Sequence, residues 1–331
     1  MQSEVPEKIL EFRFRGSGGE YFKIWIVNVL LTIMTLGVYS AWAKVRRERY
    51  FYSNTWLDDH AFEYLADPLE ILKGRAVVFA VISLSVLLIR YHPWLEPGLW
   101  VCFIVLTPWI IVKSMRFRLS RTAYRNIRFA FNGTVGETAK AFLLWPGLVP
   151  LSLGLLLPYA MYRQKRLLVE CSSYGLTPFY FHARPGEFYR VIGLAALIGV
   201  FGGAVAVGAS MLIPGTGLFL VAVPLIMFLF AFVQAHLQNL VYNNVQLDQY
   251  GLQSNFEVRK LLWIVLTNVL GTALTMGLFT PWAKVRLARY RAECMKIQGD
   301  GELEHFLADQ SRKVDSLGEE FGDAFDLDLA L

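Results

Sequence analysis

The side chains that most often perform catalysis are scattered along this sequence. Of the five histidines, none lies at metal-ligand spacing from another: His60, His92, His182, His236 and His305. The acidic residues Asp58, Asp59 and Glu63 beside His60 could hold a metal, but a polar strand tip accounts for them more simply. No zinc-protease, phosphate-loop, nucleophile-elbow or dinucleotide motif occurs. The sequence therefore predicts no catalytic residue, no metal site and no cofactor, and we expect that the protein is not an enzyme.

Basic and aromatic side chains with a repeated spacing are the chemistry that this sequence does offer. Residues 28–50 and 268–290 share an apolar stretch, a Thr-x-Gly turn, a tryptophan and then lysine and arginine, and residues 157–166 carry a weaker copy. Tryptophan and tyrosine prefer the lipid–water boundary, and a basic group near an anionic leaflet contributes about 1 kcal/mol. We predict that these residues lie at the membrane interface and contact lipid headgroups: Trp42, Lys44, Arg46, Arg49, Tyr159, Arg163, Trp282, Lys284 and Arg286.

Two interpretations of this basic pattern remain open at this point. It is typical of an interfacial anchor that sets depth and orientation, and it also fits direct recognition of a lipid headgroup or a substrate phosphate. The local sequence predicts the elements that position it. Gly37 and Gly277 are suited to end an apolar helix in a left-handed conformation. Ser40 and Thr280 can cap the helix that follows, and Pro281 occupies a first-turn position where its missing N–H is harmless.

The composition of the whole chain places these elements in a membrane. With 331 residues, 55% hydrophobic content and a mean hydropathy of +0.41, the chain is not an ordinary soluble protein. Charge-free apolar stretches occupy 24–43, 76–89, 99–112, 141–162, 191–233 and 261–283. Most approach or reach the roughly 20 residues needed to cross a bilayer, and 76–89 and 99–112 are short. The fifth is long enough for two helices. We predict an α-helical polytopic membrane protein of about seven hydrophobic helices in internal repeats, with short β-strands and interfacial helices at the cytoplasmic face.

Further similarities extend the repeat beyond the basic pattern. Residues 12–20 resemble residues 129–137, and residues 124–129 resemble residues 242–247. These polar–apolar alternating segments favour short strands that form a small sheet at the membrane surface. The matches predict repeat unit one at 1–118, repeat unit two at 119–238, a partial third repeat at 239–299 and an acidic C-terminal tail at 300–331.

The distribution of lysine and arginine leaves two topologies open. Seven alternating spans with the N-terminus outside would divide the basic residues between both faces. If each of the three repeated segments instead enters and leaves on one face, Arg90 alone lies on the opposite side. Positive-inside bias favours the second arrangement and a cytoplasmic C-terminus. That arrangement requires re-entrant or internally broken helices.

Mild polarity inside the apolar stretches limits the functions that the chain can support. These stretches contain no Asp, Glu, Lys, Arg or His, which disfavours a proton-driven pump. We predict polar contacts at the repeat interface from Asn28, Asn268, Thr35 and Thr275. The leading hypothesis is transport or a channel for a neutral or lipid-like solute. The alternative is a non-catalytic membrane scaffold or envelope-associated protein that binds a partner through its acidic tail.

The arm Phe14-x-Gly16, residues 35–58 and residues 72–75 together resemble the YjgN-like family of multi-pass bacterial inner-membrane proteins of uncharacterised function. The resemblance covers nearly the whole chain, although Asp59 stands where a glycine commonly follows the aspartate. It implies the inner (plasma) membrane as the location, but no substrate and no catalytic residues. The expected partners are the lipid bilayer, its anionic headgroups and a protein partner for the acidic tail, with no nucleic acid.

Overall fold

Ten short strands form a closed antiparallel barrel. The computed structural model describes residues 8–299. The barrel closes because β1 pairs with β2 on one side and with β10 on the other, which leaves no free edge among the described strands. The strands are β1 Lys8–Phe14, β2 Thr55–Leu57, β3 His60–Tyr64, β4 Thr122–Tyr124, β5 Ile127–Phe131, β6 Ser172–Tyr174, β7 Thr177–Phe181, β8 Val245–Leu247, β9 Tyr250–Ser254 and β10 Met295–Gly299.

Tight turns join consecutive strands at one end of this barrel. Asp58 and Asp59 between β2 and β3 have φ values of 44° and 56°, and Arg125 and Asn126 between β4 and β5 have 49° and 65°. Positive φ at both central residues is the geometry of the two-residue turn that matches the twist of antiparallel strands. The Asp58-Asp59 pair therefore adopts a tight turn without a glycine.

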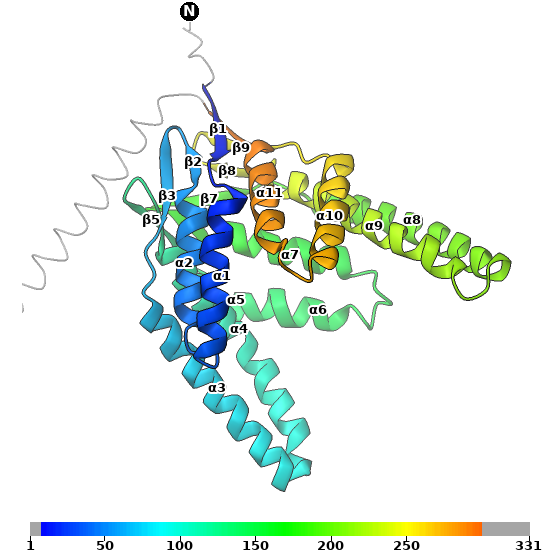
Figure 1. The fold of residues 1–331 in the computed structure, drawn as a ribbon, viewed down its shortest axis with the longest axis horizontal. Helices are drawn as coiled ribbons and strands as arrows, with labels where there is room; N and C mark the ends of the chain where they lie inside the picture. The colour runs from blue at the N-terminus through cyan, green and yellow to red at the C-terminus, as the bar shows by residue number, and fades with distance from the viewer. Residues whose placement is uncertain (1–7, 300–331) are drawn as a thin grey trace, which may run out of the picture.

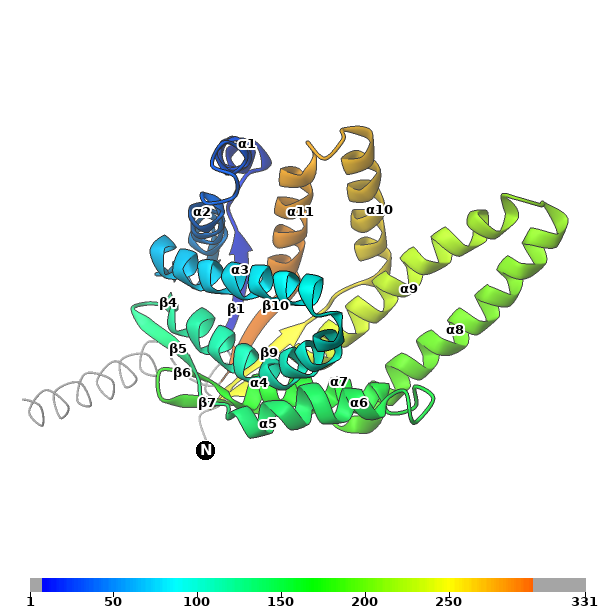
Figure 2. The same cartoon turned by 90° about the horizontal axis from the view of Figure 1, so that it is seen from below.

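Paired helices connect the strands at the other end of the barrel. Figure 1 shows these helical hairpins leaving the strands, and Figure 2, seen from below, shows β1, β10 and β9 inside a ring of helices. The helices are α1 Gly18–Met34, α2 Ser40–Ser53, α3 Pro68–Tyr91, α4 Glu96–Ser120, α5 Val135–Ala139, α6 Trp145–Leu148, α7 Leu157–Glu170, α8 Pro185–Leu212, α9 Gly217–Tyr242, α10 Val258–Leu274 and α11 Thr280–Glu293, with a 3₁₀ turn at Pro93–Leu95 and a π turn at Lys140–Leu144.

The predicted fold class, an α-helical polytopic protein with about seven hydrophobic helices, is wrong. The strands were expected as a small surface sheet, yet pairing around a full circle gives every described strand two neighbours and encloses a core. The helix count is also lower. Four helices are long and apolar enough to cross a membrane: α3, the Pro93–Ser120 segment that contains α4, α8 and α9.

The three repeated segments form short helical hairpins because a left-handed turn interrupts each apolar stretch. The turns place Leu36, Leu153 and Met276 at φ values of 50°, 51° and 49°, each followed by a glycine at 93°, 88° or 95°. The arms of 17 and 14 residues in α1 and α2 each fall short of the roughly 20 residues needed for a span. Leu36, Leu153 and Met276 are 95%, 93% and 97% exposed, so each hairpin presents an apolar tip to its surroundings.

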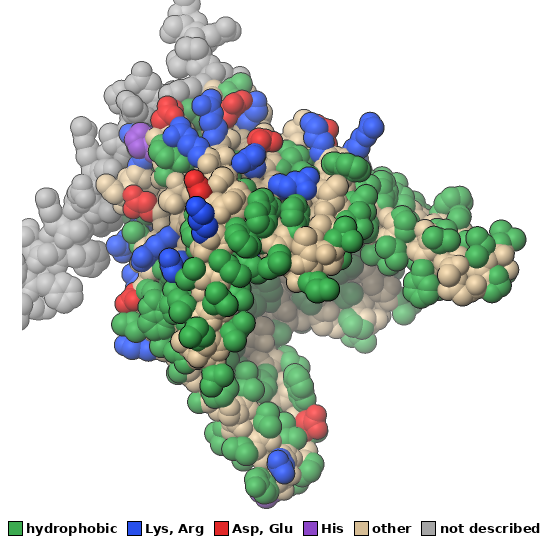
Figure 3. Space-filling model, viewed as in Figure 1, with side chains coloured by type: hydrophobic (Ala, Val, Ile, Leu, Met, Phe, Trp, Pro, Cys, Tyr) green, Lys and Arg blue, Asp and Glu red, His purple; other side chains and the backbone are tan. Residues whose placement is uncertain are grey.

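The two long hairpins, α3–α4 and α8–α9, extend beyond the short ones. Figure 3 shows hydrophobic side chains covering their distal parts, whereas lysine and arginine gather near the strands and the adjoining helix ends. Each of these helices has 24 residues or more. Because both arms of a hairpin start and end at the barrel, a pair that crosses the bilayer returns the chain to the side that it left.

This connectivity bears on the two topologies left open by the sequence. Within residues 8–299, Arg90 alone among lysines and arginines lies in the last turn of α3, beside the turn of a long hairpin. The other basic residues of residues 8–299 lie on strands, in the turns and connections next to strands, on the short hairpins or in the barrel-side parts of the long helices. Strands from all three predicted repeat units join the same barrel. The predicted acidic tail at 300–331 lies outside the described residues.

Candidate functional site

Three adjoining cavities run from the inside of the barrel to the short hairpin α1–α2. We call them the barrel cavity of about 270 Å³, the central cavity of about 560 Å³ and the hairpin groove of about 380 Å³. Phe12 and Phe62 line both the barrel cavity and the central cavity. Arg47 and Lys284 line both the central cavity and the hairpin groove. The shared walls make the three spaces neighbours in one series.

The barrel cavity is lined only by apolar and aromatic side chains. Alternation along the strands turns residues such as Leu57, Phe129 and Tyr174 inward. Two of its three tyrosines direct their hydroxyls to the backbone: Tyr124 donates to the Leu57 carbonyl oxygen at 2.7 Å, and Tyr174 donates to the Tyr124 carbonyl oxygen at 2.9 Å. Burial raises the pKa of Tyr124 to about 12, so its hydroxyl stays protonated at neutral pH. This space suits a hydrocarbon chain better than an ion.

The central cavity combines aromatic walls with positive charge. It lies between α2 and α11, which face each other across β1 at the end of the barrel (Figure 2). Phe51 and Leu287 contribute apolar surface, and Arg47, Lys284 and Arg291 contribute cations. Arg47 is paired with Glu48, the side-chain nitrogen and oxygen being 2.8 Å apart. The cavity is therefore amphipathic, with no acidic side chain in its described lining.

Lys284 is electrostatically perturbed in this setting. Its side chain reaches solvent through the open cavity, yet the protein atoms around its amine displace water. Loss of hydration lowers the pKa of Lys284 below its usual value, and the nearby charge of Arg47 lowers it further, while Glu48 opposes the shift. Two cations from different hairpins thus face the same space, and a bound anion would reduce the repulsion between them.

The hairpin groove contains a buried polar atom without a partner. Asn28 is 7% exposed, and its Oδ1 accepts no hydrogen bond from the described residues. The equivalent Asn268 of α10 accepts a hydrogen bond from Arg286 at 3.1 Å and donates to the Ala283 carbonyl oxygen at 3.3 Å. In the first hairpin the matching Arg46 donates instead to the Tyr39 hydroxyl. Asn28 consequently lines the groove with an unused acceptor.

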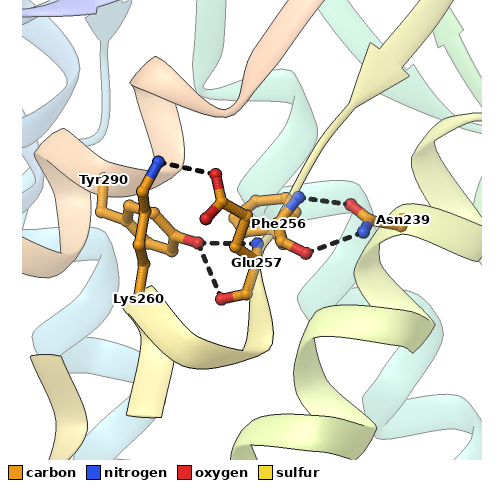
Figure 4. A network of polar contacts seen from close by, with 5 residues as sticks. All are labelled: Asn239, Phe256, Glu257, Lys260 and Tyr290. Atoms are coloured by element: carbon orange, nitrogen blue, oxygen red, sulfur yellow. Dashed lines mark hydrogen bonds and ion pairs between the residues drawn. The ribbon is translucent and has the colours of Figure 1, made fainter. Parts of the chain in front are cut away.

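A tyrosine at the end of each matched hairpin holds the start of that hairpin. Figure 4 shows Tyr290 of α11 bonding both backbone polar groups of Glu257. The Tyr290 hydroxyl accepts from the Glu257 N–H at 2.9 Å and donates to the Glu257 carbonyl oxygen at 3.1 Å. Asn239 of α9 bonds the neighbouring Phe256 backbone in the same way. In the first hairpin the Tyr50 hydroxyl does the same for Ser17: it accepts from the Ser17 N–H at 2.9 Å and donates to the Ser17 carbonyl oxygen at 2.8 Å.

Arginines clamp the strand-to-helix junctions of the ring. Arg289 donates to the Gly16 carbonyl oxygen, and Arg49 donates to the Ala66 carbonyl oxygen, both at 3.1 Å. Arg116 of α4 donates to the Gly133 carbonyl oxygen at 3.0 Å. Each clamp joins one hairpin to the next unit of the ring. Arg49, which the sequence predicts at a lipid headgroup, has a backbone partner in the structure.

The predicted interface residues lie along the second arms of the short hairpins. The aromatic members stack locally: Trp42 on Tyr39 at 6.1 Å, Trp282 against Phe22 of α1 at 4.9 Å, and Tyr159 against Trp145 at 4.6 Å between ring centres. Lys44 lines the hairpin groove. Arg163 lies apart, in a polar hollow between α5 and α7. Thus Lys44 and Lys284 lie together at the cavities, whereas Tyr159 and Arg163 do not.

The two predicted threonines act within their own turns. Thr35 donates to the Leu31 carbonyl oxygen at 2.7 Å and accepts from the Tyr39 N–H at 2.9 Å, and Thr275 makes the same pair of bonds with Gly271 and Phe279. These bonds hold the left-handed turn closed.

Sequence reasoning missed Arg47 and Arg291 as cavity residues. Their repeat counterparts are Leu287 and Phe51, so neither charge belongs to the shared pattern. A search for basic residues that break the repeat, rather than follow it, would have found them.

The barrel, the cavities and four helices that are long and apolar enough to cross a bilayer are together the features of a membrane protein whose strands lead into a ring of helical hairpins. The chain belongs to the family described as "Bacterial protein of unknown function (DUF898)", whose model matches residues 9–324. It is 25% identical over 350 aligned residues to "Inner membrane protein YjgN" of Salmonella typhimurium, an alignment that covers 87% of this chain and 88% of that relative. A protein of the same name from Escherichia coli O157:H7 is 32% identical over 132 residues, 40% of this chain and 33% of the relative.

These comparisons confirm the resemblance to the YjgN-like family and the inner-membrane location. No solved structure matches this chain.

Proposed function

We propose that this inner-membrane protein binds a lipid-like solute and moves it between the bilayer and the inside of its barrel, without chemical change. The observation that carries the proposal is the series of adjoining cavities, which ends in a wholly apolar space of about 270 Å³. Hydrophobic burial favours transfer of a hydrocarbon chain into such a space over water. The short hairpins, with their exposed apolar tips, supply a route from lipid to that space.

The shape of the ring supports exchange with lipid rather than passage of ions. The barrel cavity has no charged lining, and backbone carbonyl oxygens accept the hydrogen bonds of the Tyr124 and Tyr174 hydroxyls. An ion entering it would lose its hydration without gaining ligands, which is strongly unfavourable. An uncharged or long-chain solute avoids that cost.

Filling the barrel cavity tests the proposal. Leu252 lines this cavity, so Leu252→Trp places a larger ring inside the barrel. Ile9 is 56% exposed on β1, and Ile9→Trp adds similar bulk outside. Two quantities are measured for wild type, Leu252→Trp and Ile9→Trp: the lipid retained on the purified protein and the lipid exchanged between vesicles. We expect both quantities to fall several-fold in Leu252→Trp and to stay near wild type in Ile9→Trp. Equal retention and exchange in the three proteins would refute the proposal.

The alternative, a scaffold that binds a partner through the acidic tail, makes a different prediction. Deleting residues 312–331 removes much of the acidic and apolar sequence at the C-terminus. A protein that co-purifies with the full-length chain but not with the shortened one, together with no lipid exchange by either chain, would favour the scaffold. Lipid exchange by the purified chain without any co-purifying protein favours the solute-binding function.

A further inference from the structure

Two cations from different hairpins meet where the central cavity joins the hairpin groove. Arg47 belongs to α2 and Lys284 to α11, and both side chains line both spaces. Like charges in a partly dehydrated space repel, so an arrangement that brings them together gains stability when an anion binds between them. Lys284 has no ion pair with a described residue, and the one pairing of Arg47 is with its neighbour Glu48.

Further positive charge surrounds this junction on both sides. Arg291 lines the central cavity, while Lys44 and Arg75 line the hairpin groove. Arg75 donates to the Ser40 hydroxyl, a bond that ties α3 to the start of α2. No acidic residue appears in the described lining of either space. The junction is therefore a cationic zone between an apolar barrel and an apolar hairpin tip.

Asn28 adds a directional polar group to the same zone. Its side chain is buried in α1, and its Oδ1 has no hydrogen-bond donor in the described structure. A buried amide left without a partner is costly, and native proteins satisfy nearly all such groups. A hydroxyl or N–H of a bound molecule in the groove would supply the missing donor. In the matched hairpin Arg286 fills that role for Asn268, so the first hairpin differs at the position that faces the cations.

We propose that Arg47 and Lys284 form a binding site for the anionic headgroup of an acyl-chain amphiphile whose hydrocarbon occupies the central and barrel cavities. The inference rests on the proposed function and names the class of solute. The order of charged and apolar surface matches such a molecule. The cations at the junction would contact its headgroup, and its hydrocarbon would pass Phe51, Phe12 and Phe62 of the central cavity into the apolar barrel cavity. A phosphodiester of a membrane phospholipid and the carboxylate of a free fatty acid share this chemistry.

Binding of defined lipids to the delipidated full-length protein in neutral detergent tests the site. The probes are dioleoyl phosphatidylglycerol, oleate and dioleoyl phosphatidylcholine, the last having the same chains as the first and no net charge. We expect wild type to bind at least one anionic probe about tenfold more tightly than phosphatidylcholine, the size expected for charge-assisted contacts in a partly dehydrated site. Preference for phosphatidylglycerol identifies a membrane phospholipid as the source, and preference for oleate identifies a free fatty acid.

Charge-removing variants locate the site. The double variant Arg47→Gln, Lys284→Gln removes both junction cations. The double variant Arg128→Gln, Lys165→Gln is the matched control, because it removes two exposed cations that line none of the three cavities. The first pair should lose the preference for anionic probes, the second should keep it, and Lys284→Arg should keep it because the charge remains. Thermal unfolding of each variant verifies that it folds.

The outcomes separate the inference from the function on which it rests. If wild type binds phosphatidylcholine as tightly as both anionic probes, and Leu252→Trp blocks all of them, the protein binds lipid but the headgroup site is wrong. If the junction variant retains the anionic preference of wild type, the site is also wrong. If wild type binds none of the probes, the proposed function itself fails.

Discussion

Basic side chains of the same short hairpins perform different tasks, and their partners distinguish them. Arg49 and Arg289 bond backbone carbonyl oxygens at strand-to-helix junctions, so they hold the ring together. Lys284 and Arg47 face open cavities. A basic residue that has a backbone partner is expected to affect stability when replaced, and one that faces a cavity is expected to affect binding.

The Tyr290 hydroxyl likewise bonds the backbone at a strand-to-helix junction, so removing it tests whether such bonds stabilise the fold. Tyr290→Phe leaves the Glu257 N–H without its acceptor, while the Glu257 carbonyl oxygen keeps the bond from the Leu261 N–H, and an N–H left unsatisfied away from water costs about 1–3 kcal/mol. We therefore expect a lower thermal unfolding temperature in detergent. The control is Tyr180→Phe, because Tyr180 on β7 is half exposed, and this change should alter the unfolding temperature little. A Tyr290→Phe protein as stable as the control would show that the clamp contributes nothing.

Lys284 supplies a prediction about pH. Because its folded-state pKa is lowered, chiefly by loss of hydration, its protonated form destabilises the fold below that pKa, and the penalty disappears as the pH rises toward the unfolded value of 10.5. In the absence of lipid, Lys284→Met should unfold at a higher temperature than wild type at pH 7. The gap should narrow as the pH approaches 10.5, other titrations being common to both proteins. A gap that does not change with pH would argue against a perturbed Lys284.

At the scale of elements, the left-handed turns decide how the apolar stretches fold. Gly277 has φ of 95° with open space around it, so a methyl group there is strained by the backbone and not by a clash. Gly277→Ala should destabilise the protein by about 1–2 kcal/mol. Gly136, which lies inside α5 with equally open surroundings, provides the control. Gly136→Ala should be neutral or stabilising in thermal unfolding, because alanine favours helix. Equal effects of the two changes would contradict this account.

These turns also show what the sequence could and could not predict. Glycine after an apolar stretch predicted the break at Gly37 and Gly277 correctly. The predicted caps are wrong, because Ser40 and Thr280 are the first residues of α2 and α11 and make no capping bond: the Ser40 hydroxyl accepts from Arg75, and the Thr280 hydroxyl donates to the Gly277 carbonyl oxygen. The strands at 12–14 and 179–181 were recognisable from alternation. Their closure into one barrel was not, because strands of three to seven residues carry no signal for which partner they choose across the chain. Counting apolar stretches as spans produced the wrong number of helices.

The sequence predicted the candidate site only in part. Lys44, Lys284 and Asn28 lie in the repeated pattern and were named from it. Arg47 and Arg291 gain their importance only when α2 and α11, distant in sequence, approach each other at the end of the barrel. Repetition marks the residues that build each hairpin, whereas a site between hairpins depends on the residues by which they differ.

At the scale of the whole molecule, the ring of strands and hairpins sets the side on which each part meets the membrane. Consecutive strands turn at one end of the barrel, and all helical connections leave from and return to the other. Both ends of the described chain, paired through Lys8 and Gly299, lie on the barrel itself. Positive-inside bias then favours a cytoplasmic barrel, with the turns of α3–α4 and α8–α9 on the periplasmic face.

Cysteine labelling decides between this arrangement and alternating spans. In a protein whose Cys102, Cys171 and Cys294 are replaced, single cysteines are introduced at both ends of the first hairpin, Gly19→Cys and Ser53→Cys, and at the two long-hairpin turns, His92→Cys and Thr216→Cys. A maleimide that cannot cross the membrane should label positions 19 and 53 only in inverted vesicles and positions 92 and 216 only in intact spheroplasts. Because α1 and α2 return the chain to the barrel, positions 19 and 53 must react together. If they react from opposite sides, the segment crosses the membrane, and neither the hairpin groove nor its junction with the central cavity could exist as described.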